Sequence, residues 1–300
     1  MVEPEAGLVR GRSTERWNGM RDLRVSSWLE LVEALYDIPL TSHQRYRSDY
    51  VYRGLADQSW GLATSLMRMS GDYQNLEGPL LRSFRKYAEP GSLPPGTIWT
   101  LLSVAQHHGL PTRLLDWTVS PKVAVHFATA EEEHFDKDGV IWCVNVGEAR
   151  SLLPPRLRDV LSREYAFLFS VEMLESIRTL SEFDELAGAE GFVLFFEPPA
   201  LDSRIVNQWA IMSVMPGPRL VLSEFLLNHP SIYRRVIIPK EMKWQVRDML
   251  DQDNVTERML FPGLDGLSRW LKRYYGPGPT RKSIFGQGVD RAASRRRPTA

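Results

Sequence analysis

The sequence predicts a single main α/β or α+β domain, in which helices flank a mixed central sheet. Short apolar runs rich in β-branched residues indicate buried strands, and Val140–Val146 is the clearest of them. Segments with helical spacing separate these runs, but strands and helices do not alternate strictly. Apolar residues make up 43% of the 300-residue chain, which is enough for a sizeable core. We therefore expect one folded body over residues 26–275 rather than a doubly wound parallel sheet.

Capping residues and apolar spacing predict the elements of the N-terminal half. Residues 1–25 are polar and lack periodicity, so we expect a flexible lead-in there. Ser27–Glu30 fits a capping box and predicts the start of a helix. Tyr50–Arg53 is aromatic and β-branched, which favours a strand that ends in a turn at Gly54. Two further helices are predicted, near Leu80–Tyr87 and from Thr97 to about His108.

The C-terminal half contains most of the predicted strands. Pro121 follows Ser120, which marks the first turn of a helix. Four apolar runs are expected to be strands: Val140–Val146, Phe192–Phe196, Ile211–Met215 and Val236–Ile238. Two helices are expected to end the domain: Lys240–Leu250 and Leu264–Tyr275. A Gly-Pro-Gly-Pro run, residues 276–279, then stops the regular structure, so residues 276–300 are expected to form a disordered tail.

Charge is unevenly distributed along a chain whose formal net charge is zero. Residues 276–300 contain six basic residues and one acidic residue, which gives this tail a net charge of +5. The rest of the chain therefore has a net charge of −5. A mildly acidic body is not typical of a nucleic-acid-binding surface. The basic tail could contact nucleic acid or another polyanion, although such an end is more often a solvated arm.

Composition also indicates a compartment. The longest apolar runs fall far short of the ~20 residues that a membrane helix needs, and no secretory signal is visible at residues 1–12. Cys143 is the single cysteine, so no internal disulfide can form. The six histidines lack the spacing of a metal site, and no metal is expected. We expect a soluble cytoplasmic protein with no membrane partner.

Polar side chains are densest between Gln106 and Thr118. Gly109 and Pro111 fix a turn after a predicted helix, and Arg113 and Asp116 are close enough in sequence to pair. A rigid turn that carries several hydrogen-bonding side chains is typical of a pocket wall. Each residue alone also has a structural interpretation, since histidines favour helix C-termini and an Arg–Asp pair can simply hold a turn.

Several segments resemble the FRG domain, a family named for an Arg-Gly motif preceded by Phe. Tyr replaces that Phe in this chain. The similar segments are Tyr52–Gly54, Ala105–Thr118, Ser120–Ala128, Arg204–Ala210 and Leu260–Leu267. The resemblance spans roughly residues 45–270, and it rests mainly on the long central motif.

A second resemblance is to ADP-ribosyltransferases of the Arg–Ser–Glu type. It rests on the order of a strand ending Tyr-Arg-Gly and a Thr/Ser segment that runs into an Ala/Phe-rich helix. This resemblance implies an ADP-ribosyltransferase-like arrangement of the sheet, with NAD as the cofactor. It implies that Arg53 holds phosphate or ribose, that Thr118 or Ser120 braces the nicotinamide ribose, and that a late carboxylate, Glu257, stabilises a cationic transition state.

The expected pocket gathers side chains from distant parts of the chain. We expect it to bind a nucleotide or another small molecule. The cofactor-binding candidates are Arg53, Gly54, Gln106, Arg113, Asp116, Ser120 and Gln208. The catalytic candidates are Arg53, His107, Thr118 and Glu257. His107 is the first choice for general acid–base work, because the unperturbed pKa of histidine lies near neutrality.

Two classes of function stay open from the sequence. The first is an NAD-dependent ADP-ribosyltransferase or NAD glycohydrolase, whose acceptor macromolecule the sequence does not name. The second is a non-catalytic module that binds a nucleotide or a protein group, because Val255 stands where the paired acid of the catalytic pattern would be. A nuclease built on the histidines is disfavoured by the acidic body.

Overall fold

An eight-stranded mixed sheet organises the structure, a computed structural model that describes residues 21–37, 45–69, 71–188 and 190–278. The strands are β1 (Asp22–Arg24), β2 (Tyr50–Leu55), β3 (Leu115–Thr118), β4 (Gly139–Asn145), β5 (Phe169–Ser170), β6 (Leu194–Glu197), β7 (Ala210–Val214) and β8 (Tyr233–Ile238). Their order across the sheet is β1-β8-β4-β2-β3-β7-β6-β5. The β1–β8 and β5–β6 pairs are parallel and the other pairs are antiparallel, which confirms the predicted mixed sheet.

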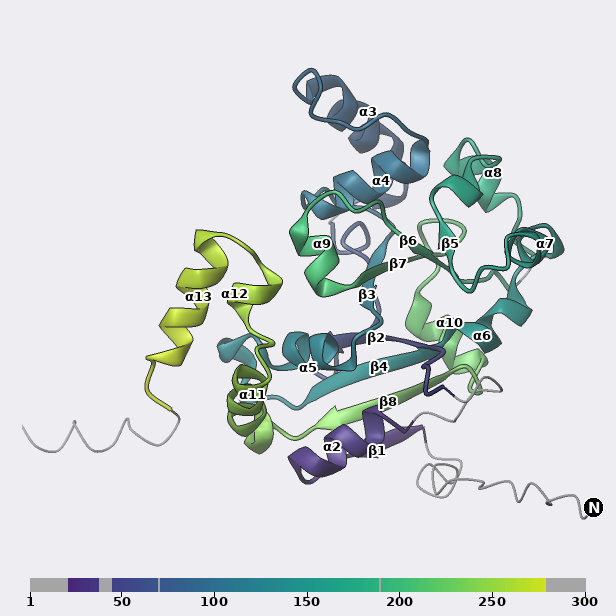
Figure 1. Cartoon of the computed structure of the whole chain (residues 1–300). Helices are drawn as coiled ribbons and strands as arrows, with labels where there is room; N and C mark the ends of the chain where they lie inside the picture. Colours follow the sequence, from purple (N-terminus) through teal and green to yellow (C-terminus); the bar gives the residue numbers. More distant parts are fainter. Residues whose placement is uncertain (1–20, 38–44, 70, 189, 279–300) are drawn as a thin grey trace, which may run out of the picture.

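Twelve α-helices accompany the sheet within the described residues (Figure 1). They are α2 (Trp28–Leu35), α3 (Glu77–Tyr87), α4 (Ile98–His107), α5 (Pro121–Thr129), α6 (Val146–Ala149), α7 (Pro155–Arg163), α8 (Leu180–Asp184), α9 (Ser203–Gln208), α10 (Leu222–Asn228), α11 (Lys243–Gln252), α12 (Glu257–Leu260) and α13 (Leu264–Tyr274). Among these residues no helix has the length and apolar character needed to cross a bilayer.

The core lies on both faces of the sheet. Helices α2, α5 and α11 cover one face of the β1-β8-β4-β2 half, where Tyr52, Ile141 and Val236 are buried. The opposite face buries Val51 and Trp142 among the residues that precede and form α10. A third cluster packs α4, α7 and α8 against the β7-β6-β5 half. One face of each half therefore has its own helical cover, whereas the cluster that includes α10 spans both halves.

Gly54 allows the closest contact between a helix and the sheet. A Cβ at this position would lie 1.9 Å from the backbone oxygen of Ala124 in α5. Any larger residue would push α5 away from β2. The glycine of the Tyr-Arg-Gly segment is therefore a packing position.

The sheet splits between β2 and β3. The two strands pair at one position, Tyr52 opposite Thr118, whereas β2 pairs with β4 along its whole length. Beyond that position β3 turns away from β2, as Figure 1 shows. Backbone and side chains of both halves are therefore exposed to a common space at this point.

The expected domain boundaries, residues 26 and 275, can be compared with the described residues near both ends of the chain. Residues 1–20 of the expected lead-in lie outside the described residues, but Asp22–Arg24 form β1 and pair with β8. The ordered body thus begins before residue 26. Residues 279–300 of the expected tail also lie outside the described residues.

Candidate functional site

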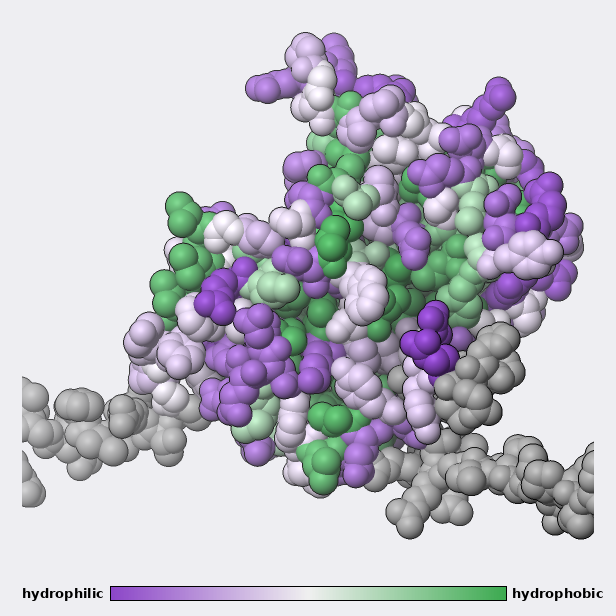
Figure 2. Space-filling model, in the orientation of Figure 1, coloured by the Kyte–Doolittle hydropathy of each residue, from purple (hydrophilic) through white to green (hydrophobic). Residues whose placement is uncertain are grey.

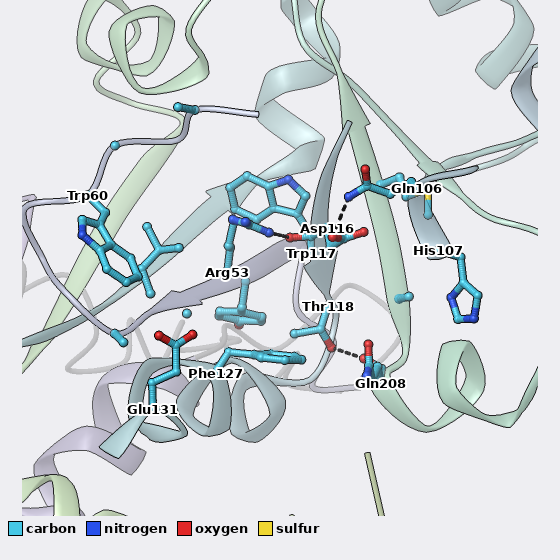
Figure 3. A pocket seen from close by; sticks show the side chains of 18 of the residues that line it. Arg53, Trp60, Gln106, His107, Asp116, Trp117, Thr118, Phe127, Glu131 and Gln208 are labelled. Atoms are coloured by element: carbon cyan, nitrogen blue, oxygen red, sulfur yellow. Dashed lines mark hydrogen bonds between the residues drawn. The ribbon is translucent and has the colours of Figure 1, made fainter. Parts of the chain in front are cut away.

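A cavity of about 740 Å³ opens where β2 and β3 separate (Figure 3). β2 contributes Arg53 and Gly54, and β3 contributes Asp116, Trp117 and Thr118. Side chains that alternate along one strand normally face opposite sides of a sheet. Consecutive residues of β3, Asp116 to Thr118, all line the cavity, because β3 diverges from β2 at this point. Helices α4, α5 and α9 supply further walls through Gln106, His107, Phe127, Arg204, Ile205 and Gln208, and the segment after β2 adds Trp60 and Arg68.

Arg53 is a half-buried cation inside this cavity. Its Nη1 donates to the backbone oxygen of Asp116 at 2.5 Å, a bond that crosses the split in the sheet. Its buried Nε has no hydrogen-bond partner. Burial lowers the pKa of Arg53 against the raising effect of the Asp116 carboxylate. Arginine stays protonated even so. The cavity therefore contains a positive charge that the protein compensates only in part.

Gln106 and Asp116 form a connected polar wall. Gln106 Nε2 donates to Asp116 Oδ2 at 2.8 Å, while its Oε1 accepts from the buried Thr112 hydroxyl at 2.6 Å. The hydroxyl of Thr112 also accepts from the backbone N–H of Leu114. This chain fixes the orientation of the Gln106 amide, and it holds the Asp116 carboxylate at the cavity.

The expected Arg113–Asp116 pair does not form. Arg113 is buried and binds two other carboxylates, Glu77 at 2.6 Å and Asp184 at 2.5 Å. Arg113 lies in a bend before β3, whereas Asp116 lies within β3. Arg113 is absent from the cavity lining and ties α3 and α8 to the segment before β3.

Thr118 and Gln208 join β3 to α9. Thr118 Oγ1 donates to the backbone oxygen of Gln208 at 2.7 Å and accepts from the N–H of Ser120. The Gln208 side chain donates to the backbone oxygen of Leu260 at 2.9 Å. Both residues line the cavity, but the Thr118 hydroxyl and the side-chain N–H of Gln208 form their hydrogen bonds within the protein. They position the α9 wall.

His107 lies at the end of α4 and also contacts α9. Its Nε2 is 2.8 Å from Asp202 Oδ2. Asp202 caps α9, because its Oδ1 accepts from the N–H of Ile205. Burial would raise the pKa of Asp202, but these two contacts lower it. His107 thus borders the cavity and anchors the helix that carries Arg204 and Gln208.

Two predicted residues do not reach the cavity. Ser120 precedes α5 and makes no side-chain cap bond, and it is absent from the lining. Glu257 is 6% exposed and binds Arg247 and Arg273 at 2.9 and 2.8 Å. Although burial would raise the pKa of Glu257, the hydrogen bond from Arg273 and the charge of Arg247 lower it to about 2. The structure brings Arg53 and Thr118 together but leaves Glu257 in a separate buried charge cluster.

Sequence reasoning missed several lining residues: Trp60, Arg68, Phe127, Glu131 and Arg204. Trp60, Phe127 and Glu131 surround one side of the cavity, with Arg53 on the other (Figure 3). Phe127 belongs to α5, whereas Glu131 lies two residues beyond the last residue of that helix, so helical spacing does not predict that both line the cavity. Arg204 has a buried Nε without a partner and stacks over Phe261. Within the described ranges, no group of three His, Cys, Asp or Glu side chains could hold a metal ion.

Comparison with known proteins bears on the part of the chain that forms most of this site. No curated protein matches the chain, and neither does any solved structure. One protein-family model matches, over residues 48–137. That segment supplies Arg53, Gln106, His107, Asp116, Thr118, Phe127 and Glu131, whereas the α9 wall lies outside it. The matching model is that of the FRG domain, and the matched segment, residues 48–137, contributes most of the residues that line the cavity.

Proposed function

We propose that the cavity binds a nucleotide of the NAD class. The observation that carries this proposal is Arg53, a half-buried guanidinium with one described hydrogen-bond acceptor and a buried, unpartnered Nε. Removing a cation from water is costly unless an anion compensates it. The planar guanidinium fork suits a phosphate, which accepts two parallel hydrogen bonds.

The rest of the lining suits the other parts of a nucleotide. Arg68 and Arg204 add two more guanidinium groups at the cavity. Trp60, 39% exposed, and Phe127 offer aromatic faces on which a base or nicotinamide ring can stack. A volume of about 740 Å³ lies within the range of small-molecule sites. Charged and aromatic groups in one cavity favour a ligand that has both.

A second candidate function is cleavage of the bound NAD. Two carboxylates, Asp116 and Glu131, line the cavity, and Glu131 has only a 3.4 Å contact with His134 as an ion pair. In such a reaction the bond between ribose C1′ and the nicotinamide nitrogen breaks, and nicotinamide leaves with the electron pair. Water or an acceptor nucleophile then bonds to C1′ and loses a proton. A nearby carboxylate would stabilise the positive charge that develops on the ribose.

Non-catalytic binding is the simpler form of the same proposal. Glu257, the carboxylate that the ADP-ribosyltransferase resemblance implies, is neutralised by two arginines away from the cavity. Binding needs only the arginines and aromatic rings, whereas cleavage needs Glu131 or Asp116 to replace Glu257.

The experiment combines calorimetry with an assay of nicotinamide release. We expect NAD to bind the wild-type chain and Arg53→Gln to weaken binding at least tenfold. Arg158→Gln changes an exposed arginine on α7 and should bind like wild type. Binding without nicotinamide release supports the non-catalytic form. Release that is lost in Glu131→Gln, with binding kept, supports cleavage. Absence of binding by wild type, or equal affinity in Arg53→Gln, contradicts the proposal.

A further inference from the structure

Helix α13 packs on the protein through a side that mixes charged and apolar residues, since Leu267 and Trp270 are partly buried beside the buried Arg273. The two residues that it buries are Gly266 and Arg273. Arg273 donates to the carboxylates of Asp251 and Glu257, and a Cβ at Gly266 would lie 1.9 Å from the backbone oxygen of Phe261. The helix is therefore attached through a close backbone contact and ion pairs.

The outward side of α13 is apolar. Leu264, Leu271 and Tyr275 are 79%, 37% and 80% exposed. They are spaced by seven and four residues, which places them along one face. Figure 2 shows hydrophobic surface at the left edge of the molecule, where Figure 1 places α13. A surface helix normally turns its apolar stripe toward the core. In α13 only Leu267 and Trp270 follow this rule, and the row of Leu264, Leu271 and Tyr275 stays exposed in the described part of the chain.

We propose that a second copy of this chain covers this face, with its own α13 packed antiparallel. In a two-fold pair, residue i contacts residue j of the other copy and j contacts i. Antiparallel packing about the middle of the helix places Leu264 opposite Tyr275 and Leu271 opposite Ser268. Both contacts then occur twice.

The charges beside the stripe match the same arrangement. Asp265 and Lys272 are seven residues apart, so they lie on the same flank of the helix. Neither forms an ion pair with another described residue. In the antiparallel pair the acidic start of one helix lies beside the basic end of the other. Asp265 of each copy therefore faces Lys272 of the second copy, whereas in a parallel pair this flank would face the opposite flank of the other helix and the two residues would not meet.

The proposed contact between the two copies is small, and its size determines how tightly we expect them to associate. One pair of three-turn helices buries less than the ~1,200 Å² of a standard stable interface. We therefore expect an association that depends on concentration rather than a permanent dimer. The second copy covers α13 and does not occupy the cavity, so this inference stands independently of the proposed ligand.

Sedimentation velocity of the full chain over a concentration series tests the proposal. The mass of the wild type should rise toward twice 34.4 kDa. Leu271→Glu should remove this rise. Lys272→Asp should also remove it, and adding Asp265→Lys should restore it, because the swapped charges attract again. Leu29→Glu changes a leucine on α2 that is 65% exposed and should behave like wild type. Circular dichroism checks that each variant is folded.

Three results would overturn the proposal. A wild type that stays monomeric at every concentration removes the second copy as the occupant. Association that survives Leu271→Glu places the contact elsewhere on the surface. A folded double swap that stays monomeric excludes the antiparallel arrangement.

Discussion

Glu257, in α12, lies at the centre of a buried hydrogen-bond network that connects four helices. It accepts hydrogen bonds from Arg247 of α11 and Arg273 of α13, and Arg247 in turn contacts His126 of α5. We expect Glu257→Gln to lower the free energy of unfolding by about 3–5 kcal/mol, because the buried Arg247 loses its carboxylate partner and Arg273 keeps only Asp251. Urea unfolding measures this loss, and Glu133→Gln, on the exposed surface, is the control. Unchanged stability together with weaker ligand binding would instead show that Glu257 acts in ligand binding.

His126 predicts how stability depends on pH. Burial, aided by the charge of Arg247, lowers its pKa from 6.5 to about 3. Between these values the unfolded chain binds the proton and the folded chain does not. Stability is therefore lost as pH falls below 6.5, by about 1.4 kcal/mol per pH unit. Glu257, with a pKa lowered to about 2, adds a further loss below pH 4.5.

The measurement for this prediction is urea unfolding of wild type and His126→Gln at pH 7, 6 and 5. The slope between pH 6 and 5 should be smaller in His126→Gln. An identical slope in both proteins would show that His126 is not held neutral in the folded state.

At the scale of elements, α9 is held by one carboxylate with two functions. Asp202 caps the helix and contacts His107. Asp202→Asn keeps an oxygen at the cap but loses the charge, whereas Asp202→Ala loses both. We expect Asp202→Ala to cost about 1 kcal/mol of stability and to weaken ligand binding, since α9 carries Arg204 and Gln208. Asp202→Asn should lie between wild type and Asp202→Ala in thermal melts and calorimetry. Equal effects of both variants would show that the capping hydrogen bond does not contribute to the stability of α9.

The contact of α5 with β2 gives a prediction about packing. Gly54→Ala places a methyl group 1.9 Å from a backbone oxygen that cannot move without the helix. Overpacking of this kind costs roughly 1–3 kcal/mol. Gly61 lies in the loop after β2, and a Cβ there would meet only the Ser223 side chain at 3.1 Å, so Gly61→Ala is the matched control. Thermal melts should show a lower Tm for Gly54→Ala than for Gly61→Ala. A reversed order would contradict the packing role.

Elements whose own residues are apolar could be predicted, and elements that line the cavity could not. β4 comes from a continuous apolar run that is buried on both faces, and the buried second half of β8, Val236–Ile238, comes from a shorter run of the same kind. β3 escapes prediction because Asp116 and Thr118 interrupt its apolar pattern, and these residues are polar because they border the cavity. α9 has six residues, too few for a periodic signal.

At the scale of the whole molecule, the site depends on contacts between distant segments. Arg53, Gln106 and Asp116 could be predicted because one short motif and one strand end contain them. Glu257 could not be placed, since its partners on α11 and α13 are chosen by tertiary packing rather than by order along the chain. The outward stripe of α13 shows the same limit, because periodicity identifies a helix face without showing what the face contacts.

The proposed ligand should stabilise the entire fold, since the cavity lies where the two halves of the sheet separate. A ligand that binds only the folded state stabilises it by about 2.7 kcal/mol at 100 times its Kd. For a domain of this size that raises Tm by roughly 5 °C. Arg53 bridges the halves through Asp116, so a phosphate on Arg53 also restrains both. Differential scanning fluorimetry with NAD should show this increase in wild type and Arg158→Gln, and its loss in Arg53→Gln. An equal increase in Arg53→Gln would mean that NAD binds elsewhere on the molecule.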